Sequence, residues 1–188
     1  MWLKEITVSN YKAIREMSIG FQQGVNLLIG DNGVGKTSVL EAITVAFGDF
    51  INGMSGVAKK GISSNDVRMD TKMISDASQG IIHYTPITIT SIFYTEDGEK
   101  NGEVTRRDET AKSKTRFLGK QISDYANKKV NDLSEELPLF CYYSTSRLAP
   151  PKREDYGTVS KNKLNDRRCG YSGCMENNLD IQALKAWC

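Results

Sequence analysis

The sequence is poor in the residues that most often bind transition metals or form disulfide frameworks. It holds one histidine, His83, and four cysteines, at positions 141, 169, 174 and 188. Cys169 and Cys174 are separated by four residues, and no second close pair of cysteines or histidines accompanies them. Because structural zinc sites use four closely spaced ligands, we do not expect a zinc-binding domain. Cys141 lies in an apolar run and is expected in the core, and we expect reduced thiols.

Long apolar runs are also absent. No stretch approaches the roughly 20 apolar residues of a membrane-spanning helix. The first nine residues, MWLKEITVS, alternate polar and apolar side chains instead of forming a signal-peptide core. We therefore expect a cytoplasmic protein with no membrane partner.

The composition is that of a globular chain, with 39% hydrophobic and 26% charged residues among 188. This length fits one domain or a large part of a two-lobed one. There is no internal repeat or low-complexity tract. A net charge of +2 leaves nucleic-acid binding open but is too small to argue for it.

The first thirty residues carry strand patterns. Polar and apolar residues alternate over residues 2–9 and again over residues 17–21, with a turn-like segment at 9–12. We predict an N-terminal antiparallel β-hairpin from this pattern. After a turn at 22–24, residues 25–29 (VNLLI) are almost continuously apolar. This run is typical of a strand buried on both faces at the centre of a mixed sheet.

The next eight residues, GDNGVGKT, complete the phosphate-loop pattern Gly-x-x-x-x-Gly-Lys-[Ser/Thr]. Glycines let the backbone turn tightly, so that successive N–H groups converge on phosphates, and a following helix adds partial positive charge. Lys36 would lie between the β- and γ-phosphates of a nucleotide, and the Thr37 hydroxyl would bind Mg²⁺. The expected nucleotide-binding residues of this segment are Gly30, Asn32, Gly33, Gly35, Lys36, Thr37 and Ser38.

A helix is predicted directly after this loop. Over residues 35–47 the apolar positions recur at helical spacing, at Val39, Leu40, Ile43, Ala46 and Phe47. The order strand, glycine loop, helix is the context that phosphate binding requires. We therefore predict an α/β P-loop NTPase fold with a mixed sheet, an N-terminal antiparallel hairpin and a central helix after the loop.

The remainder of the chain gives weaker patterns. Residues 48–80 are expected to form an irregular insertion, residues 86–94 a strand, and residues 96–102 a hairpin loop with a returning strand. A second helical stripe ends near Asn131, and residues 137–143 resemble a second buried strand. We assign residues 1–146 to the N-terminal portion of an ATPase domain. We assign residues 147–188 to a basic loop and a short C-terminal helix that start the second part of this domain.

The first fifty residues resemble the opening of the SMC and RecF group of ABC-class ATPases. The resemblance is carried by LKEITVSNYKAIREMSIGFQQGVNLLIGDNGVGKTSVLEAI, which includes an Asn-aromatic-basic turn between two strands and Asn-Gly before Gly-Lys-Thr. YYSTSR (142–147) and RRCGYSGC (167–174) resemble bacterial RecF-like AAA family ATP-binding proteins of defence or virulence-associated loci.

This resemblance implies a two-lobed head in which ATP, with Mg²⁺, lies between the phosphate loop of one copy and a signature loop of another. It also implies a homodimer or larger assembly of complete heads and a nucleotide-gated role on DNA, in repair or defence. A basic residue of the Asn-aromatic-basic turn approaches the nucleotide phosphates in this family, which corresponds to Lys12, with Arg15 as a second candidate. A solvated turn lysine is the alternative for Lys12.

Several motifs of that family are missing. Leu133-Ser134-Glu135-Glu136 begins like a signature but lacks its glycines, and Glu96-Asp97 reverses the order of an Asp-Glu pair. We interpret those two acids as hairpin-tip charges. Gln79 is the candidate for the glutamine that senses the metal, and Asp66 is the second choice for that position. GTP is disfavoured because Asn-Lys-x-Asp is absent.

Hydrolysis needs a carboxylate to polarise water and donors that stabilise the transferred phosphoryl group. We therefore expect an incomplete head of ATPase type that binds ATP without hydrolysing it. The alternative is a non-hydrolysing, ATP-dependent interaction or regulatory module.

A basic segment follows the last predicted strand and has interleaved tyrosines. Such a pattern suits phosphate backbones and stacked bases, although a solvated loop is the usual alternative. Arg147 follows the predicted strand directly and could point toward the nucleotide. The cations of the segment are Arg147, Lys152, Arg153, Lys161, Lys163, Arg167 and Arg168.

Overall fold

The structure is a computed structural model that describes residues 1–75, 78–143, 167–171 and 174. The predicted N-terminal hairpin is confirmed: β1 (Trp2–Tyr11) pairs antiparallel with β2 (Ile14–Gly20), and Tyr11 lies opposite Ile14 across a two-residue turn. A register shift between Leu3 and Glu5 against the neighbouring strand brings both Leu3 and Ile6 into the core. A β-bulge of this kind interrupts the simple alternation that the sequence shows.

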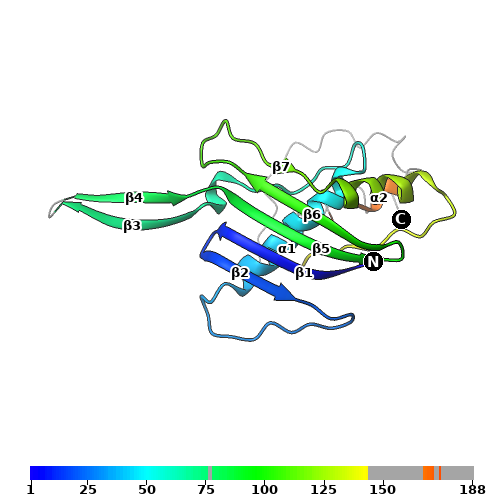
Figure 1. Cartoon of the computed structure of the whole chain (residues 1–188), viewed down its shortest axis with the longest axis horizontal. Coiled ribbons are helices and arrows are strands. Elements are labelled where there is room, and N and C mark those ends of the chain that lie inside the picture. The colour runs from blue at the N-terminus through cyan, green and yellow to red at the C-terminus, as the bar shows by residue number, and fades with distance from the viewer. Residues whose placement is uncertain (76–77, 144–166, 172–173, 175–188) are drawn as a thin grey trace, which may run out of the picture.

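Five strands form one antiparallel sheet in the order β2-β1-β5-β6-β7 (Figure 1). The added strands are β5 (Ile87–Thr95), β6 (Gly98–Arg106) and the short β7 (Arg116–Phe117). The hairpin between β5 and β6 was predicted, but its expected loop over residues 96–102 is wrong. Only Glu96 and Asp97 form the turn, because Gly98 adopts a φ of 93° and lets β6 begin at once.

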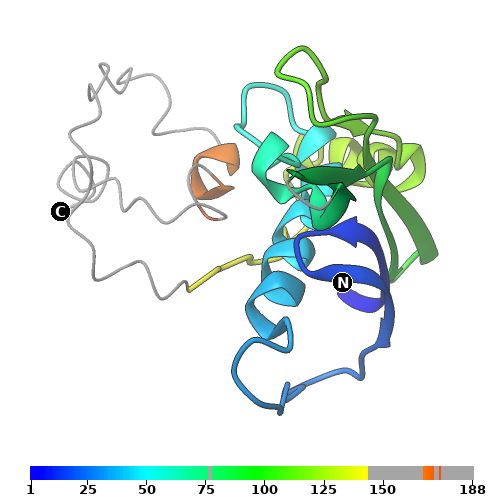
Figure 2. The same ribbon diagram turned by 90° about the vertical axis from the view of Figure 1, so that its left-hand side faces the viewer.

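Two helices cover one face of this sheet (Figures 1 and 2). The helix predicted after the phosphate loop is α1 (Lys36–Asn52), and the second helical stripe is α2 (Lys120–Asn131), which ends where predicted. Beyond residue 47, α1 continues for five residues. It does so through Gly48, where a Cβ atom would lie 2.5 Å from the Phe117 ring. Gly48 therefore permits close packing of α1 on β7.

A buried carboxylate joins α1 to the rest of the core. The Asp49 side chain is fully buried, and its oxygens accept hydrogen bonds from the backbone N–H groups of Glu103 (2.5 Å) and Gly119 (3.2 Å). These donors belong to β6 and to the N-cap of α2. One side chain thus fixes the positions of three elements.

The expected irregular insertion at 48–80 contains regular structure. A short 3₁₀ helix, η1 (Ser64–Asp66), leads into the hairpin of β3 (Arg68–Ser75) and β4 (Ser78–Tyr84), which projects from the domain (Figure 1). β3 and β4 pair only with each other among the described strands. With both faces away from the main sheet, the hairpin has no sustained alternation of buried and exposed positions, which is the signal for strands.

Two predicted strands are wrong. Residues 25–29 are extended but pair with no described strand, and Val25, Leu27 and Ile29 are 99%, 78% and 85% exposed. Residues 137–143 are also irregular, and Cys141, expected in the core, is exposed. In both runs the apolar composition suits a central strand, but the described sheet provides no neighbour for either.

Most of the C-terminal predictions lie outside the described residues. These include Arg147, the lysines of the basic segment and the short helix expected near the C-terminus. Residues 167–171 form a 3₁₀ helix, η4 (Arg167–Tyr171), whose Tyr171 packs on Phe50 and Phe140. Within the described ranges, no helix is long and apolar enough to cross a membrane.

Candidate nucleotide-binding site

The glycine loop ends at the N-terminus of α1. Gly35 is the N-cap of the helix with a φ of 99°, and Gly33 has a φ of 91°, a region that is costly for residues with a Cβ atom. No side chain caps the helix. The first N–H groups of α1 therefore lack intrahelical acceptors and, with the helix dipole, form an anion-binding position.

Lys36 extends back over this loop. Its ammonium donates hydrogen bonds to the carbonyl oxygens of Gly30 and Asp31, both at 2.6 Å. The side chains of Asn32 and Thr37 are exposed beside it, and Ser38 is half-buried. A cation held among exposed backbone groups fits a polyphosphate, whose oxygens would replace the two carbonyl acceptors. The Thr37 hydroxyl, which makes no hydrogen bond to a described residue, fits a magnesium ligand at the same end of the helix.

Lys12 lies in an ion cluster with two carboxylates. Its ammonium pairs with Glu41 of α1 and, at 3.6 Å, with Asp66 of η1, while its backbone N–H donates to the Asp66 carbonyl at 2.7 Å. Burial lowers the Lys12 pKa, but the hydrogen bond and charge of Glu41, together with Asp66, raise it above its ordinary value. The lysine therefore stays protonated.

This ion cluster lies beside the phosphate loop. A Cβ atom placed on Gly35 would be 3.7 Å from the Ile14 side chain, which follows Lys12 by two residues. The structure thus brings the turn at 11–13 next to the loop, as the resemblance implies, while the Lys12 ammonium contacts carboxylates. Contact between Lys12 and phosphate stays a prediction, as do the roles of the loop residues. Arg15, the second candidate, is exposed on β2.

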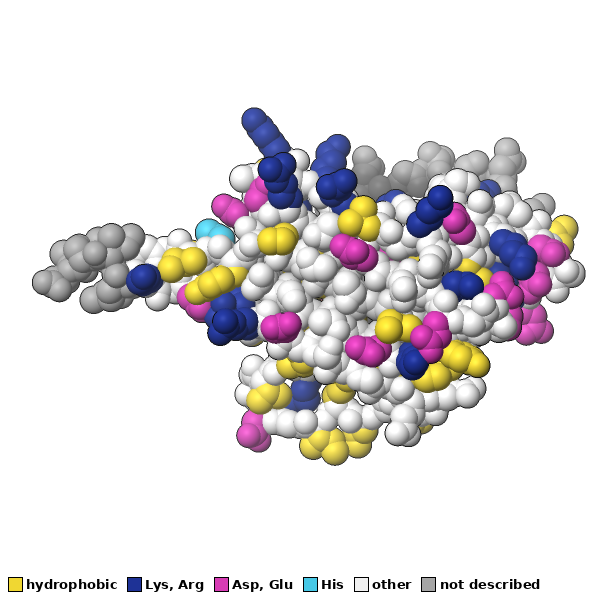
Figure 3. Space-filling view, in the orientation of Figure 1, with side chains coloured by type: hydrophobic (Ala, Val, Ile, Leu, Met, Phe, Trp, Pro, Cys, Tyr) yellow, Lys and Arg dark blue, Asp and Glu magenta, His cyan; other side chains and the backbone are white. Residues whose placement is uncertain are grey.

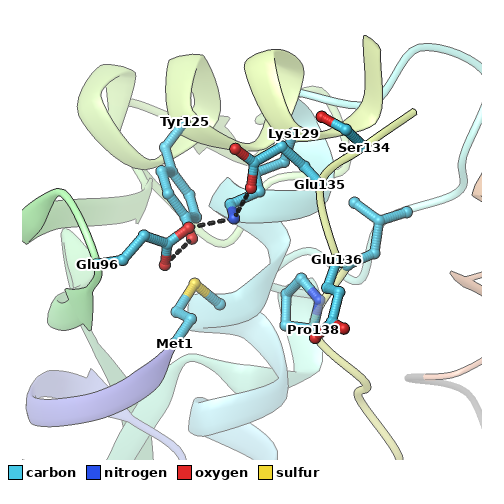
Figure 4. A pocket seen from close by; sticks show the side chains of 9 residues that line it. Met1, Glu96, Tyr125, Lys129, Ser134, Glu135, Glu136 and Pro138 are labelled. Carbon is cyan, nitrogen blue, oxygen red and sulfur yellow. Dashed lines mark hydrogen bonds and ion pairs between the residues drawn. The ribbon is translucent and has the colours of Figure 1, made fainter. Parts of the chain in front are cut away.

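Glu96 and Asp97 belong to a different part of the molecule. Figure 1 shows the turn between β5 and β6 beside α2, far from the start of α1. The Glu96 carboxylate accepts a hydrogen bond from the Tyr125 hydroxyl at 2.7 Å and pairs with Lys129 (Figure 4). The hydrogen bond from Lys129 is the main reason that the pKa of Glu96 falls to about 2. These acids are hairpin-tip charges, as interpreted from the sequence.

The signature-like segment lies at the same place. Residues 134–138 line a pocket of about 450 Å³ together with Met1, Glu96, Tyr125 and Lys129 (Figure 4). Glu135 pairs with Lys129 at 2.5 Å. Leu133-Ser134-Glu135-Glu136 therefore holds the chain against α2 and presents no glycine amides to a phosphate.

The two described arginines of the basic segment hold the chain together. Arg167 donates to the carbonyl oxygens of Asp132 and Glu135, and Arg168 donates to the Ser55 carbonyl at 2.8 Å. Both guanidinium groups are thus engaged with backbone oxygens. Stacked-base or phosphate contact by these two arginines, which the sequence suggested, is not supported by their positions.

Sequence reasoning missed two acids that shape the site and the core. Glu41 carries no motif signal, since an acid on a helix is normally solvated. Asp49 did carry a signal in the sequence, because it stands between Gly48 and Phe50 on the apolar side of a helix. A buried acid at such a position indicates hydrogen-bond donors nearby.

The chain is similar to one protein family and to several known proteins. The protein-family profile described as "AAA domain" matches residues 5–185. The DNA double-strand break repair Rad50 ATPase of Archaeoglobus fulgidus is 49% identical over 45 residues, covering 24% of this chain and 5% of the relative. The DNA replication and repair protein RecF of Streptococcus equi subsp. zooepidemicus is 46% identical over 43 residues, covering 23% and 12% respectively.

One solved structure, the SMC head domain from Thermotoga maritima, aligns with a TM-score of 0.46 and 17% identity, covering 68% of this chain and 42% of that one. The matched stretches amount to about an eighth or less of the length of these two curated relatives. The family profile, in contrast, extends over nearly all of the present sequence. The chain therefore belongs to the AAA-domain family, and it is similar to Rad50 and RecF over about a quarter of its length.

Proposed function

We propose that this chain binds ATP with Mg²⁺ at the loop of residues 30–37. The observation that carries this proposal is the Lys36 ammonium, held at 2.6 Å from two loop carbonyls at the uncapped N-terminus of α1. Loop amides and Lys36 would bind the β- and γ-phosphates, and the Thr37 hydroxyl would bind Mg²⁺. The bound metal supplies charge neutralisation for the phosphates.

Titration of labelled ATP against the chain and its Lys36→Ala variant tests this proposal. Removing a charge-assisted contact should weaken ATP binding about tenfold or more. Lys72→Ala, which removes an exposed lysine of β3, is the matched control and should bind like the wild type. Equal affinity of the Lys36→Ala variant and the wild type would contradict the proposal.

We expect binding without hydrolysis by these 188 residues alone. The support is that candidate carboxylates in the described part of the chain are engaged: Glu41 and Asp66 pair with Lys12, and Glu96 with Lys129. The same observation favours the second candidate function, an ATP-dependent interaction module. Phosphate release separates binding from turnover, and measurable turnover by the purified chain would show that a catalytic carboxylate is present.

The biological role that we propose is nucleotide-gated association on DNA, with ATP held between two copies. It is supported by the family and by the names of two relatives, which concern DNA repair. Those relatives match only about a quarter of this chain. The proposed role in repair or in defence therefore rests on membership of the family and not on a relative that matches the whole chain.

A further inference from the structure

The loop that joins β6 to β7, together with the first residue of β7, carries four exposed cations. Its cations, which lie within ten residues, are Arg107, Lys112, Lys114 and Arg116. All four are exposed, and none forms a salt bridge with a described residue. Two acids, Asp108 and Glu109, share the segment. The surplus of positive charge here equals that of the whole chain.

Internal hydrogen bonds hold this loop in one conformation. The buried guanidinium of Arg106 donates to the carbonyl oxygens of Asp108 (2.9 Å), Thr110 (2.7 Å) and Ile62 (3.1 Å). The Asp108 carboxylate accepts from the Thr110 N–H at 3.0 Å. Thr115 accepts from the Ile62 N–H at 2.9 Å. The backbone is thus fixed from several sides, and Oδ1 of Asp108 is engaged within the loop.

The cations gather on one side of the molecule. Figure 3 shows dark blue side chains along its upper edge, where Figure 1 places the β6–β7 loop and β7. The aromatic ring of this region, Phe117, is half-buried, with the Lys59 ammonium 4.7 Å from its centroid. Binding of single strands relies on exposed aromatic rings that stack on bases. Residues 107–117 combine exposed cations on a fixed backbone with no exposed aromatic ring, which suits the phosphates of a duplex.

We infer that the β6–β7 loop is a contact surface for the backbone of duplex DNA, through Arg107, Lys112, Lys114 and Arg116. This surface is distinct from the nucleotide loop and deepens the DNA-associated role in the proposed function, on which it rests. Contacts to phosphates carry no base sequence, so binding is independent of sequence and depends steeply on salt.

The test is a salt titration of binding to a labelled duplex of random sequence, about 30 base pairs long. The triple variant Lys112→Ala, Lys114→Ala, Arg116→Ala is compared with the wild-type chain. Each lost phosphate contact should lower the slope of log K against log salt by roughly 1. At about 50 mM salt the variant should bind at least about tenfold more weakly.

A control triple variant, Lys4→Ala, Lys72→Ala, Lys128→Ala, removes the same charge elsewhere and should keep most of the slope. Equal losses in the two variants, or no binding of duplex by the wild type, would overturn the inference. So would binding of phosphatidylserine vesicles or single strands in preference to the duplex. The ATP titration of Lys36→Ala is a separate readout, so failure of ATP binding and failure of this surface are distinguishable.

Discussion

At the scale of single residues, Asp49 shows how strongly one buried carboxyl group acts. It has no exposed surface and accepts hydrogen bonds from the N–H groups of Gly119 and Glu103. Burial raises its pKa from 3.8 to about 6, although the two hydrogen bonds oppose this rise. The folded state therefore binds this proton more tightly than the unfolded state does.

We predict a pH dependence of stability from this group. Its contribution is fully present below the unfolded pKa of 3.8 and is lost as the pH rises through about 6. Urea unfolding should show that the free energy of unfolding falls less with rising pH across this interval in Asp49→Asn than in the wild type. Asp49→Ala, which leaves two buried N–H groups without acceptors, should cost about 1–3 kcal/mol. An unchanged pH dependence in Asp49→Asn would contradict the assignment.

At the scale of elements, the contact between α1 and α2 depends on Gly53. A Cβ atom at this position would lie 2.0 Å from the Ser123 carbonyl oxygen, a backbone atom that cannot turn aside. Gly53 has a φ of −71°, so close approach and not conformation requires glycine there. The two helices meet because no side chain separates them.

We therefore predict that Gly53→Ala lowers the free energy of unfolding by about 1–3 kcal/mol, because α2 must move away from α1. Gly20→Ala is the matched control, since a Cβ atom there meets nothing within 4 Å. Thermal unfolding followed by circular dichroism compares the two variants. Similar melting temperatures of the two variants would contradict the prediction, because they would show that α1 and α2 adjust to the added methyl group without loss of stability.

At the scale of the whole molecule, the apolar segment 25–29 is the largest departure from the expected architecture. Val25, Leu27 and Ile29 are almost fully exposed in a segment that pairs with no described strand. Figure 1 shows this segment running back along the β2 side of the sheet toward α1. Exposed apolar side chains on an unpaired, extended backbone favour association between chains.

We predict that the purified chain associates through this segment as its concentration rises. The double variant Val25→Ser, Leu27→Ser should sediment closer to the monomer than the wild type. Met69→Ser, Ile81→Ser removes comparable exposed side chains from the projecting hairpin and serves as control. If the control lowers association and the first variant does not, the apolar surface of the β3–β4 hairpin is responsible instead.

The sequence alone determined the features that depend on neighbours in the chain. The alternation in β1 and β2, the stripe of α2 and the glycine pattern before Lys36 are local, because turns, helices and hairpins form between nearby residues. The order of strand pair, phosphate loop and helix follows from them. So does the resemblance that the family profile bears out.

Only the tertiary structure decided which apolar runs become strands and which charges are engaged. Residues 25–29 and 137–143 have the composition of central strands, yet a strand exists only where a second strand supplies hydrogen bonds. The pairing of Lys12 with Glu41 and Asp66 joins three segments distant in sequence. The Asp49 carboxylate likewise joins α1 to β6 and to the N-cap of α2, which are distant from it in sequence. Such contacts leave no local pattern, because they depend on how the elements pack in space.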